Sequence, residues 1–304
     1  MGRYLNVGLI QMEVNEETEK NLAYLEKMVD ALMLKVHKPE LVIGVEGAIG
    51  LKEPQKIPGP ATDFLSRIAR KHGIYFLPGS MAEMEEDKDI SACYNAAPIF
   101  NPSGDIIDVY RKMCPWYPEE KFRAGTKYVV FDIPEKETKI GVQICYDSYF
   151  PEISRNLTLM GAEILVKLQL DPDPLYEPYK CLARTRAIEN QAYFIATNGV
   201  GFHSGASVYG HSIVVDPEAN ILWEGERTPV ICTITIDLDK VSNSRNYGAF
   251  FMDQTVKHLK YFNFPMPYAD DIGSAPLFRT LKPPFNTEDE YKAGLRDFHE
   301  RLNE

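Results

Sequence analysis

Hydrophobic positions along the chain follow two patterns. Apolar residues recur at intervals of three and four over residues 18–36, which predicts an amphipathic helix. The continuous apolar run Leu41–Val45 predicts a strand of the fully buried kind. By the same patterns, helices are predicted at 60–72, 151–160 and 177–190, and strands at 5–11, 74–77, 95–100, 105–110, 139–144, 163–168, 193–197, 212–215 and 221–223.

The predicted elements repeat in kind. Each half of the chain offers buried strands, two helices and one strand–turn–strand unit, with turns at Asn101–Gly104 and Asp216–Asn220. Residues 1–240 are therefore predicted to form one pseudo-repeated α/β domain. Its expected architecture is a four-layer α-β-β-α sandwich, in which two sheets pack face to face with helices outside.

The regular pattern fades from about Lys240. Residues 241–304 are predicted to form an extended C-terminal tail, and the stretch Pro265–Pro284 within it is rich in proline and aromatic residues. Because little periodicity is left there for independent folding, the tail is expected to pack on the body or on a neighbouring subunit.

Composition narrows the classes of protein. The 304 residues are 44% apolar and 25% charged, the balance of an ordinary globular chain. Lys plus Arg total 33 against 44 for Asp plus Glu, and the net charge of −11 argues against nucleic-acid binding. No apolar run approaches the roughly 18 residues of a membrane span, and no signal peptide is expected. Five cysteines without paired spacing indicate a reduced, cytoplasmic protein.

Cys145 is the best-placed cysteine for chemistry. It follows the predicted strand 139–144 and precedes a helix that begins at Pro151. A thiol at such a strand-to-helix turn is held rigidly and can face a cleft, where catalytic groups often lie. The alternative is a small buried hydrophobic residue, the commonest role of a free cysteine.

Two charged residues follow other predicted strands. Glu46 closes the apolar run 41–45, and a buried carboxylate beside a thiol can act as its base. Lys112 ends the strand 105–110, where an ammonium group could offset a buried carboxylate and stabilise an oxyanion. Both positions are also consistent with strands that have simply reached solvent. None of the six histidines stands in an obvious second motif.

No metal or cofactor is predicted. The Cys, His, Asp and Glu residues show no metal-ligand spacing, and Asp171–Pro174 is too kinked and isolated to suggest a site. The run Gly199–Ser204 lacks the third glycine of a dinucleotide loop, which argues against an NAD-binding oxidoreductase. Likewise, Gly205–Tyr209 lacks the last glycine of a hydrolase elbow.

Taken in order, these residues resemble the nitrilase, or carbon–nitrogen hydrolase, superfamily. The runs that carry the resemblance are Glu46, Tyr110-Arg111-Lys112, Cys145-Tyr146-Asp147 and Pro151-Glu152, supported by Gly161-Ala162-Glu163 and Gly210-His211-Ser212. A narrower likeness is to the aliphatic amidase and formamidase branch, through Lys112–Glu120 and Lys167-Leu168-Gln169. The likeness covers residues 4–240.

The resemblance implies hydrolysis of a small aliphatic amide to a carboxylic acid and ammonia through a cysteine thioester. It implies that Cys145 is the nucleophile, Glu46 the proton carrier and Lys112 an oxyanion donor. Glu120 would position the lysine and the substrate amine, and Trp116, Tyr146 and Gln169 would bind the substrate. The resemblance also implies a homo-oligomer, a dimer or higher.

Departures from the family pattern leave the acyl group open. Val45 and Gly47 flank Glu46 where the family usually has proline and often an aromatic residue, and Tyr149 stands where the branch has asparagine. Nitrile hydrolysis and N-carbamoyl amide cleavage are alternatives that use the same residues. A carbamoyl substrate would add a cation for its carboxylate, with candidates at Arg123, Arg184 and Arg186. A non-catalytic binding protein on the same scaffold is the alternative from another class.

Overall fold

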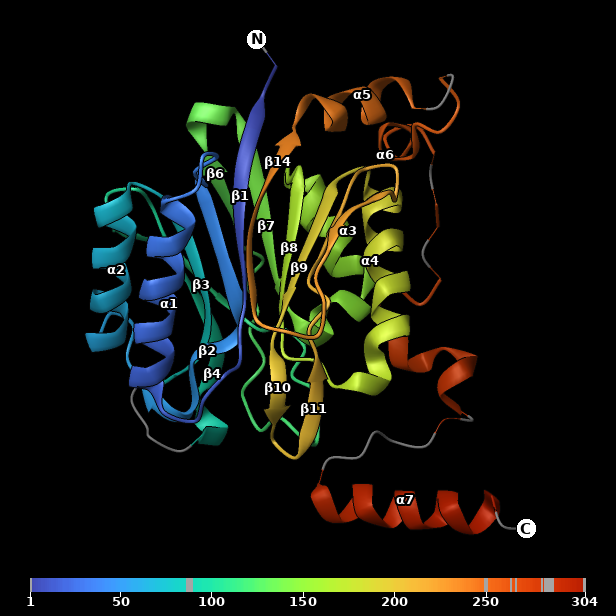
Figure 1. The fold of residues 1–304 in the computed structure, drawn as a ribbon. Helices are drawn as coiled ribbons and strands as arrows, with labels where there is room; N and C mark the ends of the chain where they lie inside the picture. The colour runs from blue at the N-terminus through green and yellow to red at the C-terminus, as the bar shows by residue number, and fades with distance from the viewer. Residues whose placement is uncertain are drawn as a thin grey trace.

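Two six-stranded sheets lie at the centre of the part of the chain that the computed structural model describes, residues 2–85, 90–248, 251–262, 264–265, 267–279, 281 and 287–302 (Figure 1). The first sheet runs in the order β14 (Val230–Asp237), β1 (Tyr4–Gln11), β2 (Leu41–Gln55), β3 (Tyr75–Glu83), β4 (Tyr94–Phe100) and β5 (Ile106–Arg111). The second runs in the order β13 (Ile221–Glu224), β12 (Ile213–Val215), β9 (Tyr193–Asn198), β8 (Ile164–Gln169), β7 (Thr138–Ile144) and β6 (Val130–Ile133).

Helices cover the outer face of each sheet. Helices α1 (Thr18–Met33) and α2 (Pro60–His72) lie on the first sheet, and α3 (Pro151–Leu159) and α4 (Tyr176–Asn190) lie on the second (Figure 1). The predicted four-layer α-β-β-α sandwich is thus confirmed. Helix α2 has the predicted bounds because Pro60 begins it and Gly73, with a φ of 63°, ends it in the left-handed conformation.

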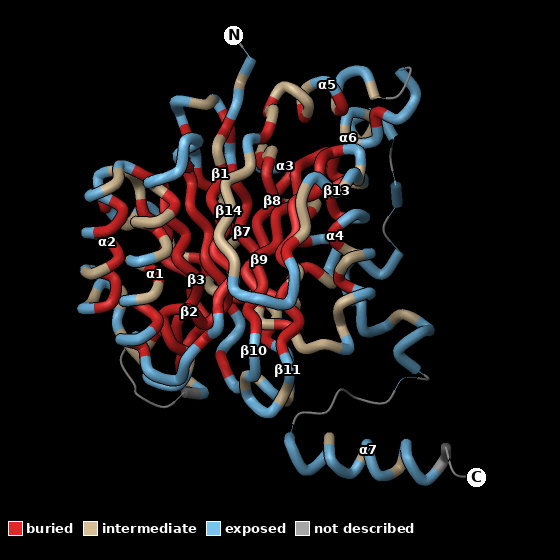
Figure 2. The backbone as a smooth tube through the Cα atoms, viewed as in Figure 1, coloured by how far each residue is buried: buried red, intermediate tan, exposed pale blue. Residues whose placement is uncertain are grey.

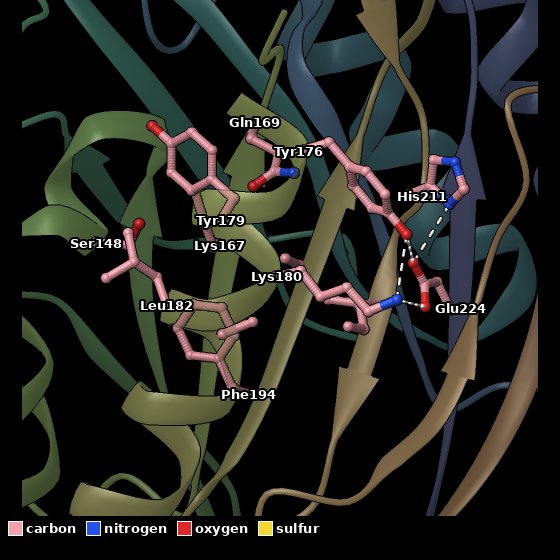
Figure 3. A pocket seen from close by; sticks show the side chains of 13 residues that line it. Ser148, Lys167, Gln169, Tyr176, Tyr179, Lys180, Leu182, Phe194, His211 and Glu224 are labelled. Carbon is pink, nitrogen blue, oxygen red and sulfur yellow. Dashed lines mark hydrogen bonds and ion pairs between the residues drawn. The ribbon is translucent and has the colours of Figure 1, made fainter. Parts of the chain in front are cut away.

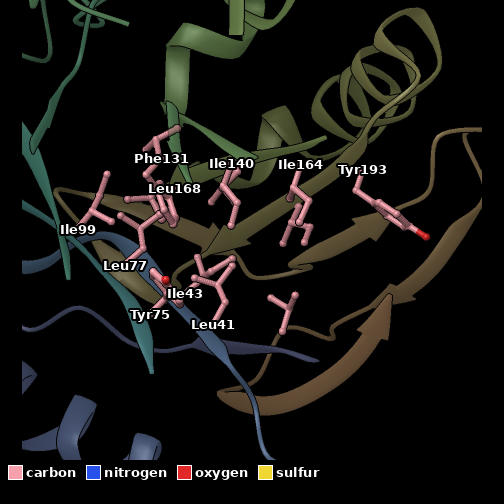
Figure 4. Close-up of a cluster of buried hydrophobic side chains, with 14 of the residues drawn as sticks. Leu41, Ile43, Tyr75, Leu77, Ile99, Phe131, Ile140, Ile164, Leu168 and Tyr193 are labelled. Carbon is pink, nitrogen blue, oxygen red and sulfur yellow. The ribbon is translucent and has the colours of Figure 1, made fainter. Parts of the chain in front are cut away.

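The main hydrophobic core fills the space between the sheets. Leu41 and Ile43 of β2 face Ile164 and Leu168 of β8 across it (Figure 4). The intervening Val42 points the other way, into a second core under α1 and α2. Burial on both faces explains the continuous apolar run of β2, and Figure 2 shows the strands as the most buried part of the chain.

The internal repeat is visible in the connections. Strands β1, β2 and β3 are parallel neighbours joined through α1 and α2, and β7, β8 and β9 are parallel neighbours joined through α3 and α4. Carboxyl ends of parallel strands meet at one edge of a sheet. Each half of the chain therefore brings its strand ends to a common edge.

Several elements differ from the sequence-based prediction. Helix α1 ends at Met33 rather than residue 36, since Leu34 and Val36 extend into solvent. Strand β14 is absent from the prediction, and it pairs antiparallel with β1 along its whole length. The run that begins at Gly199 leads into the hairpin β10 (Val200–His203) and β11 (Ala206–Tyr209), which the prediction does not include.

The C-terminal region contains helices that the fading pattern does not predict. Helix α5 (Asp239–Tyr247) buries Val241, and α6 (Thr255–His258) follows it closely. The Gln191 amide donates to the Asp253 carbonyl, which fastens this segment to α4. Helix α7 (Glu288–Leu302) lies apart from both sheets (Figure 1). Residues 266, 280 and 282–284 of the proline-rich stretch lie outside the described residues. Among the described helices, none is long and apolar enough to cross a membrane.

Candidate active site

Strands from both sheets bring the predicted catalytic residues together. Cys145 follows β7 in the second sheet, and Lys112 follows β5 in the first. Glu46 lies in β2, where the register with β3 is interrupted between Val45 and Gly50. Their exposed fractions are 7% for Cys145, 0% for Lys112 and 3% for Glu46. The strands thus converge on a site almost shielded from water.

The backbone presents the Cys145 thiol in a strained conformation. Cys145 opens the 3-10 turn Cys145–Tyr149 with a φ of 47°, a left-handed value that costs a non-glycine residue about 1–3 kcal/mol. The buried carboxylate of Asp147 holds this turn. It accepts hydrogen bonds from Tyr110 Oη at 2.6 Å, the Cys114 N–H at 2.8 Å and the Ile144 N–H at 2.9 Å. Cys114, a second thiol near the site, thus supplies a structural contact through its backbone.

Lys112 joins two carboxylates. Its Nζ lies 3.1 Å from Glu46 Oε1 and 2.7 Å from Glu120 Oε2. The Asn95 side-chain amide donates to the same two residues, at 2.8 Å to Glu46 and 3.2 Å to Glu120. Sequence reasoning did not find Asn95. These contacts fix the Glu46 carboxylate, whose oxygen lies within 4.8 Å of Cys145 Sγ.

Burial sets the protonation states of this group. It raises the pKa of Glu46 to about 7; Lys112 opposes the rise, and Glu120 and Asp171 add to it. Burial and the charges of Asp171 and Glu46 raise the pKa of the Cys145 thiol well above its usual range. Burial also works against the charge of Lys112, but Cys145, Glu46 and Glu120 outweigh it, so the pKa of Lys112 is well above its ordinary value. The resting site therefore holds a neutral thiol, an ammonium group and a carboxyl group that titrates near neutral pH.

Asp171 is a second residue that sequence reasoning missed. Cys145 Sγ donates a hydrogen bond to Asp171 Oδ1 at 2.9 Å, and Lys167 Nζ lies 3.0 Å from Asp171 Oδ2. The kinked run that contains Asp171 gives no metal-ligand pattern and so did not point to a site. The available signal was its position just after β8, since β8 is the parallel neighbour of β7, which ends at the nucleophile.

The residues predicted to bind substrate occupy different surroundings. Trp116 is 36% exposed, and its N–H donates to Glu120 Oε2 at 2.6 Å. Tyr146 packs against the rings of Tyr149 and Phe150. Gln169 is buried and donates to Tyr209 Oη at 2.8 Å. Gln169 also lines a pocket under α4, in which Tyr176, Lys180 and His211 surround Glu224 (Figure 3).

The candidate cations for a substrate carboxylate have other partners. Arg186 is buried and donates to the carbonyls of Ser148 and Tyr149, so it supports the turn that carries Cys145. Arg184 donates to the Ala219 carbonyl, and Arg123 lies over the Tyr94 ring. In the part of the chain that the structure describes, the buried cations at the thiol are Lys112 and Lys167.

A metal ion would find three ligand atoms here. Oxygen atoms of Glu46 and Asp171 and the Cys145 sulfur lie within 4.8 Å of one another. Each carboxylate, however, already binds an ammonium group, from Lys112 and Lys167 respectively. Because those cations would repel a metal ion, the arrangement favours proton transfer and nucleophilic attack.

Known proteins share this chain's sequence pattern. The sequence model of the Carbon-nitrogen hydrolase family matches residues 6–246. The chain belongs to this family. A nitrilase of Pyrococcus abyssi is 35% identical over 196 residues, 63% of this chain and 70% of that protein. A formamidase of Bacillus cereus is 30% identical over 173 residues, 57% of this chain and 51% of that protein.

The fold agrees with that assignment. The crystal structure of Saccharomyces cerevisiae Nit3, a member of branch 10 of the nitrilase superfamily, superposes with a TM-score of 0.73 and 27% sequence identity. The match covers 80% of this chain and 94% of Nit3. This carbon–nitrogen hydrolase is therefore an enzyme of the nitrilase superfamily that acts on C–N bonds.

Proposed function

We propose that this hydrolase converts a small aliphatic amide and water into a carboxylic acid and ammonia through a thioester on Cys145. One observation supports this most. A buried thiol lies within 4.8 Å of a carboxyl group that titrates near neutral pH, and an ammonium group binds that carboxyl group at 3.1 Å. Nucleophile, proton carrier and oxyanion donor thus lie within reach of one carbonyl group.

Acylation begins when Cys145 Sγ attacks the carbonyl carbon and Glu46 takes the thiol proton. Lys112 and the Tyr146 N–H stabilise the oxyanion, each donor contributing about 3–4 kcal/mol in comparable enzymes. As the C–N bond breaks, Glu46 gives its proton to the leaving ammonia. The pKa of about 7 suits Glu46 to both transfers.

Deacylation uses the same groups. Glu46 takes a proton from water, and the resulting hydroxide attacks the thioester carbon. The C–S bond then breaks, the acid leaves and the sulfur regains a proton from Glu46. Glu120 keeps Lys112 in place through its two oxygens at 2.7 and 2.8 Å and faces the amine side of the substrate. Trp116, Tyr146 and Gln169 shape the pocket in this proposal.

Nitriles are the second candidate substrates because the Pyrococcus abyssi relative is named a nitrilase. The same thiol would attack a nitrile carbon, and the resulting thioimidate would need two waters to reach the acid. N-carbamoyl acids are less favoured, since Arg123, Arg184 and Arg186 bind other groups.

A substrate panel separates these functions. Ammonia release is measured with formamide, acetamide and propionamide, with the matched acetonitrile and propionitrile, and with N-carbamoylglycine. The proposal expects release from the amides and none above background from Cys145→Ala. Release from nitriles alone would replace the amidase assignment with a nitrilase.

We also propose a cytoplasmic enzyme that assembles as a homo-oligomer. No disulfide joins any of the five cysteines, which suits a reducing compartment. Several large apolar side chains after α5 are exposed in the single chain, among them Phe251, Tyr261, Phe264 and Leu277. Such side chains favour burial against another subunit.

A further inference from the structure

We propose that Asp171, held by Lys167, is a further catalytic residue, which accepts the Cys145 thiol proton in a hydrogen bond and keeps the resting nucleophile protonated. The inference rests on the proposed role of Cys145 as the nucleophile. It goes beyond the group formed by Glu46, Lys112 and Glu120, since Asp171 approaches the sulfur from the second sheet.

The thiol has a direct partner in the structure, and that partner is Asp171. Sγ lies 2.9 Å from Asp171 Oδ1, so the S–H bond points at this carboxylate. The Glu46 carboxylate also lies near the sulfur, within 4.8 Å, where its Oε1 is already engaged by Lys112 and Asn95. With the proton turned toward Asp171 in the resting enzyme, a sulfur lone pair is free to face the substrate carbon. In this proposal the S–H bond rotates toward Glu46 as the attack begins, and Glu46 takes the proton.

Asp171 is fixed on every side. Lys167 Nζ lies 3.0 Å from Oδ2, and the Lys167 ammonium sits 3.2 Å from the centre of the Tyr179 ring. The Asp171 N–H donates to Asn198 Oδ1 at 2.9 Å, which ties the backbone to the end of β9. Both members of the ion pair are 1% exposed. Such a buried pair is costly to desolvate and is poor evidence of a role in stability alone.

Its place fits the chemistry of acylation. The proton that leaves with ammonia is the proton that the thiol brought. A resting thiolate would attack a carbonyl group without that proton. Ammonia release would then depend on the part of Glu46 that is already protonated at neutral pH. An acceptor that keeps the thiol neutral until the substrate arrives therefore favours amide cleavage, although it slows simple alkylation of the sulfur.

The substitution Asp171→Asn separates the two reactivities. Lys167 can only donate hydrogen bonds, so the Asn oxygen must turn toward it and the Asn amide toward the sulfur. The substitution thus removes a negative charge beside the sulfur and places a hydrogen-bond donor there, and each of these changes stabilises the thiolate. The other charged and titratable groups around the sulfur stay in place: Glu46, Lys112, Lys167, Tyr149, Tyr179 and Tyr209.

The experiment measures alkylation of Cys145 by iodoacetamide against pH, by peptide mass mapping, beside kcat/KM for amide hydrolysis. Asp171→Asn is expected to lower the alkylation midpoint by about one pH unit or more. It should also lower kcat/KM by about tenfold or more, because the directed thiol proton is lost. Asp173→Asn is the matched control from the same loop. Asp173 pairs with Arg227 at the surface, and its substitution should change neither quantity.

A lower alkylation midpoint together with a lower kcat/KM distinguishes this role from a structural one. If alkylation and hydrolysis fall together with the melting temperature, or if the midpoint stays where it is, Asp171 is merely structural and the proposal is wrong. Should the single variant fail to fold, Asp171→Asn with Lys167→Met removes the whole ion pair. The same direction of shift is expected, since Asp171 accepts from the sulfur directly and Lys167 binds the other carboxylate oxygen. Alkylation needs no amide substrate, so this outcome is independent of the proposed amidase activity.

Discussion

Glu46→Gln should make the protein more stable while it removes activity. The introduced amide keeps an oxygen that accepts from Lys112 and Asn95, so the variant resembles the wild type with Glu46 protonated. The folded-state pKa of about 7 lies above the ordinary 4.5. The contribution of neutral Glu46 to the unfolding free energy is therefore fully present below pH 4.5 and is lost as the pH rises through about 7.

The expected magnitude follows from that difference. Each pKa unit corresponds to about 1.4 kcal/mol, so ionised Glu46 costs about 3 kcal/mol of unfolding free energy. Glu46→Gln should recover about 3 kcal/mol at pH 8.5, and most of this gain should vanish at pH 5. The loss of the proton carrier should reduce kcat/KM by about 100-fold or more.

Urea unfolding at pH 5 and pH 8.5 provides the test, with ammonia release measured on the same preparations. Glu119→Gln is the matched control, because Glu119 is exposed, in the loop beside the site. Its unfolding free energy should stay within about 0.5 kcal/mol of the wild type. A Glu46→Gln variant that is less stable than the wild type at pH 8.5, or a gain that does not change with pH, would refute the reasoning.

Three further predictions concern the scaffold and the assembly. Asp147→Ala should cost about 3 kcal/mol or more, because it leaves Tyr110 Oη and two backbone N–H groups without their acceptor; urea unfolding would show it, and an unchanged midpoint would contradict the role of Asp147. Gly44→Ala should destabilise by about 1–3 kcal/mol, since its Cβ would lie 2.0 Å from the Pro78 carbonyl oxygen; thermal unfolding against Gly273→Ala, whose Cβ would meet only the Asp271 side chain at 3.2 Å, isolates the steric part. Deleting residues 264–304 leaves α5 and α6 on the body. It should reduce the number of subunits that light scattering measures, whereas an unchanged number of subunits would argue against a tail-mediated oligomer.

Local signals are enough to predict most of the sandwich. Helix α2 is predicted with its observed bounds because Pro60 and Gly73 act on their own turns. Strand β14 is not, because Val230–Asp237 is half-exposed and becomes a strand only by pairing with Tyr4–Gln11, far away in the sequence. The division at Lys240 stays a prediction, although α5 buries Val241 against the body.

The site is predictable where residue type and strand position agree. Lys112 and Cys145 directly follow strands, and the structure brings them together with Glu46. The predicted strand end at Glu46 is wrong, since β2 continues to Gln55, but the apolar run before Glu46 still marks it as a buried carboxylate. Asp171 was missed because its meaning depends on the register of β7 with β8, which places two strand ends side by side. Asn95 was missed because a polar residue in a strand is unremarkable until its two carboxylate partners are known.

The central claim is that Cys145 forms a thioester with the acyl group of an amide. Rapid quenching of the enzyme in acid during turnover of propionamide, followed by peptide mass mapping, tests it most directly. A propionyl adduct is expected on the peptide that contains Cys145 and on no other cysteine peptide, and it should be absent from Cys145→Ala. Ammonia release by Cys145→Ala at the wild-type rate, or an adduct on another residue, would contradict the account.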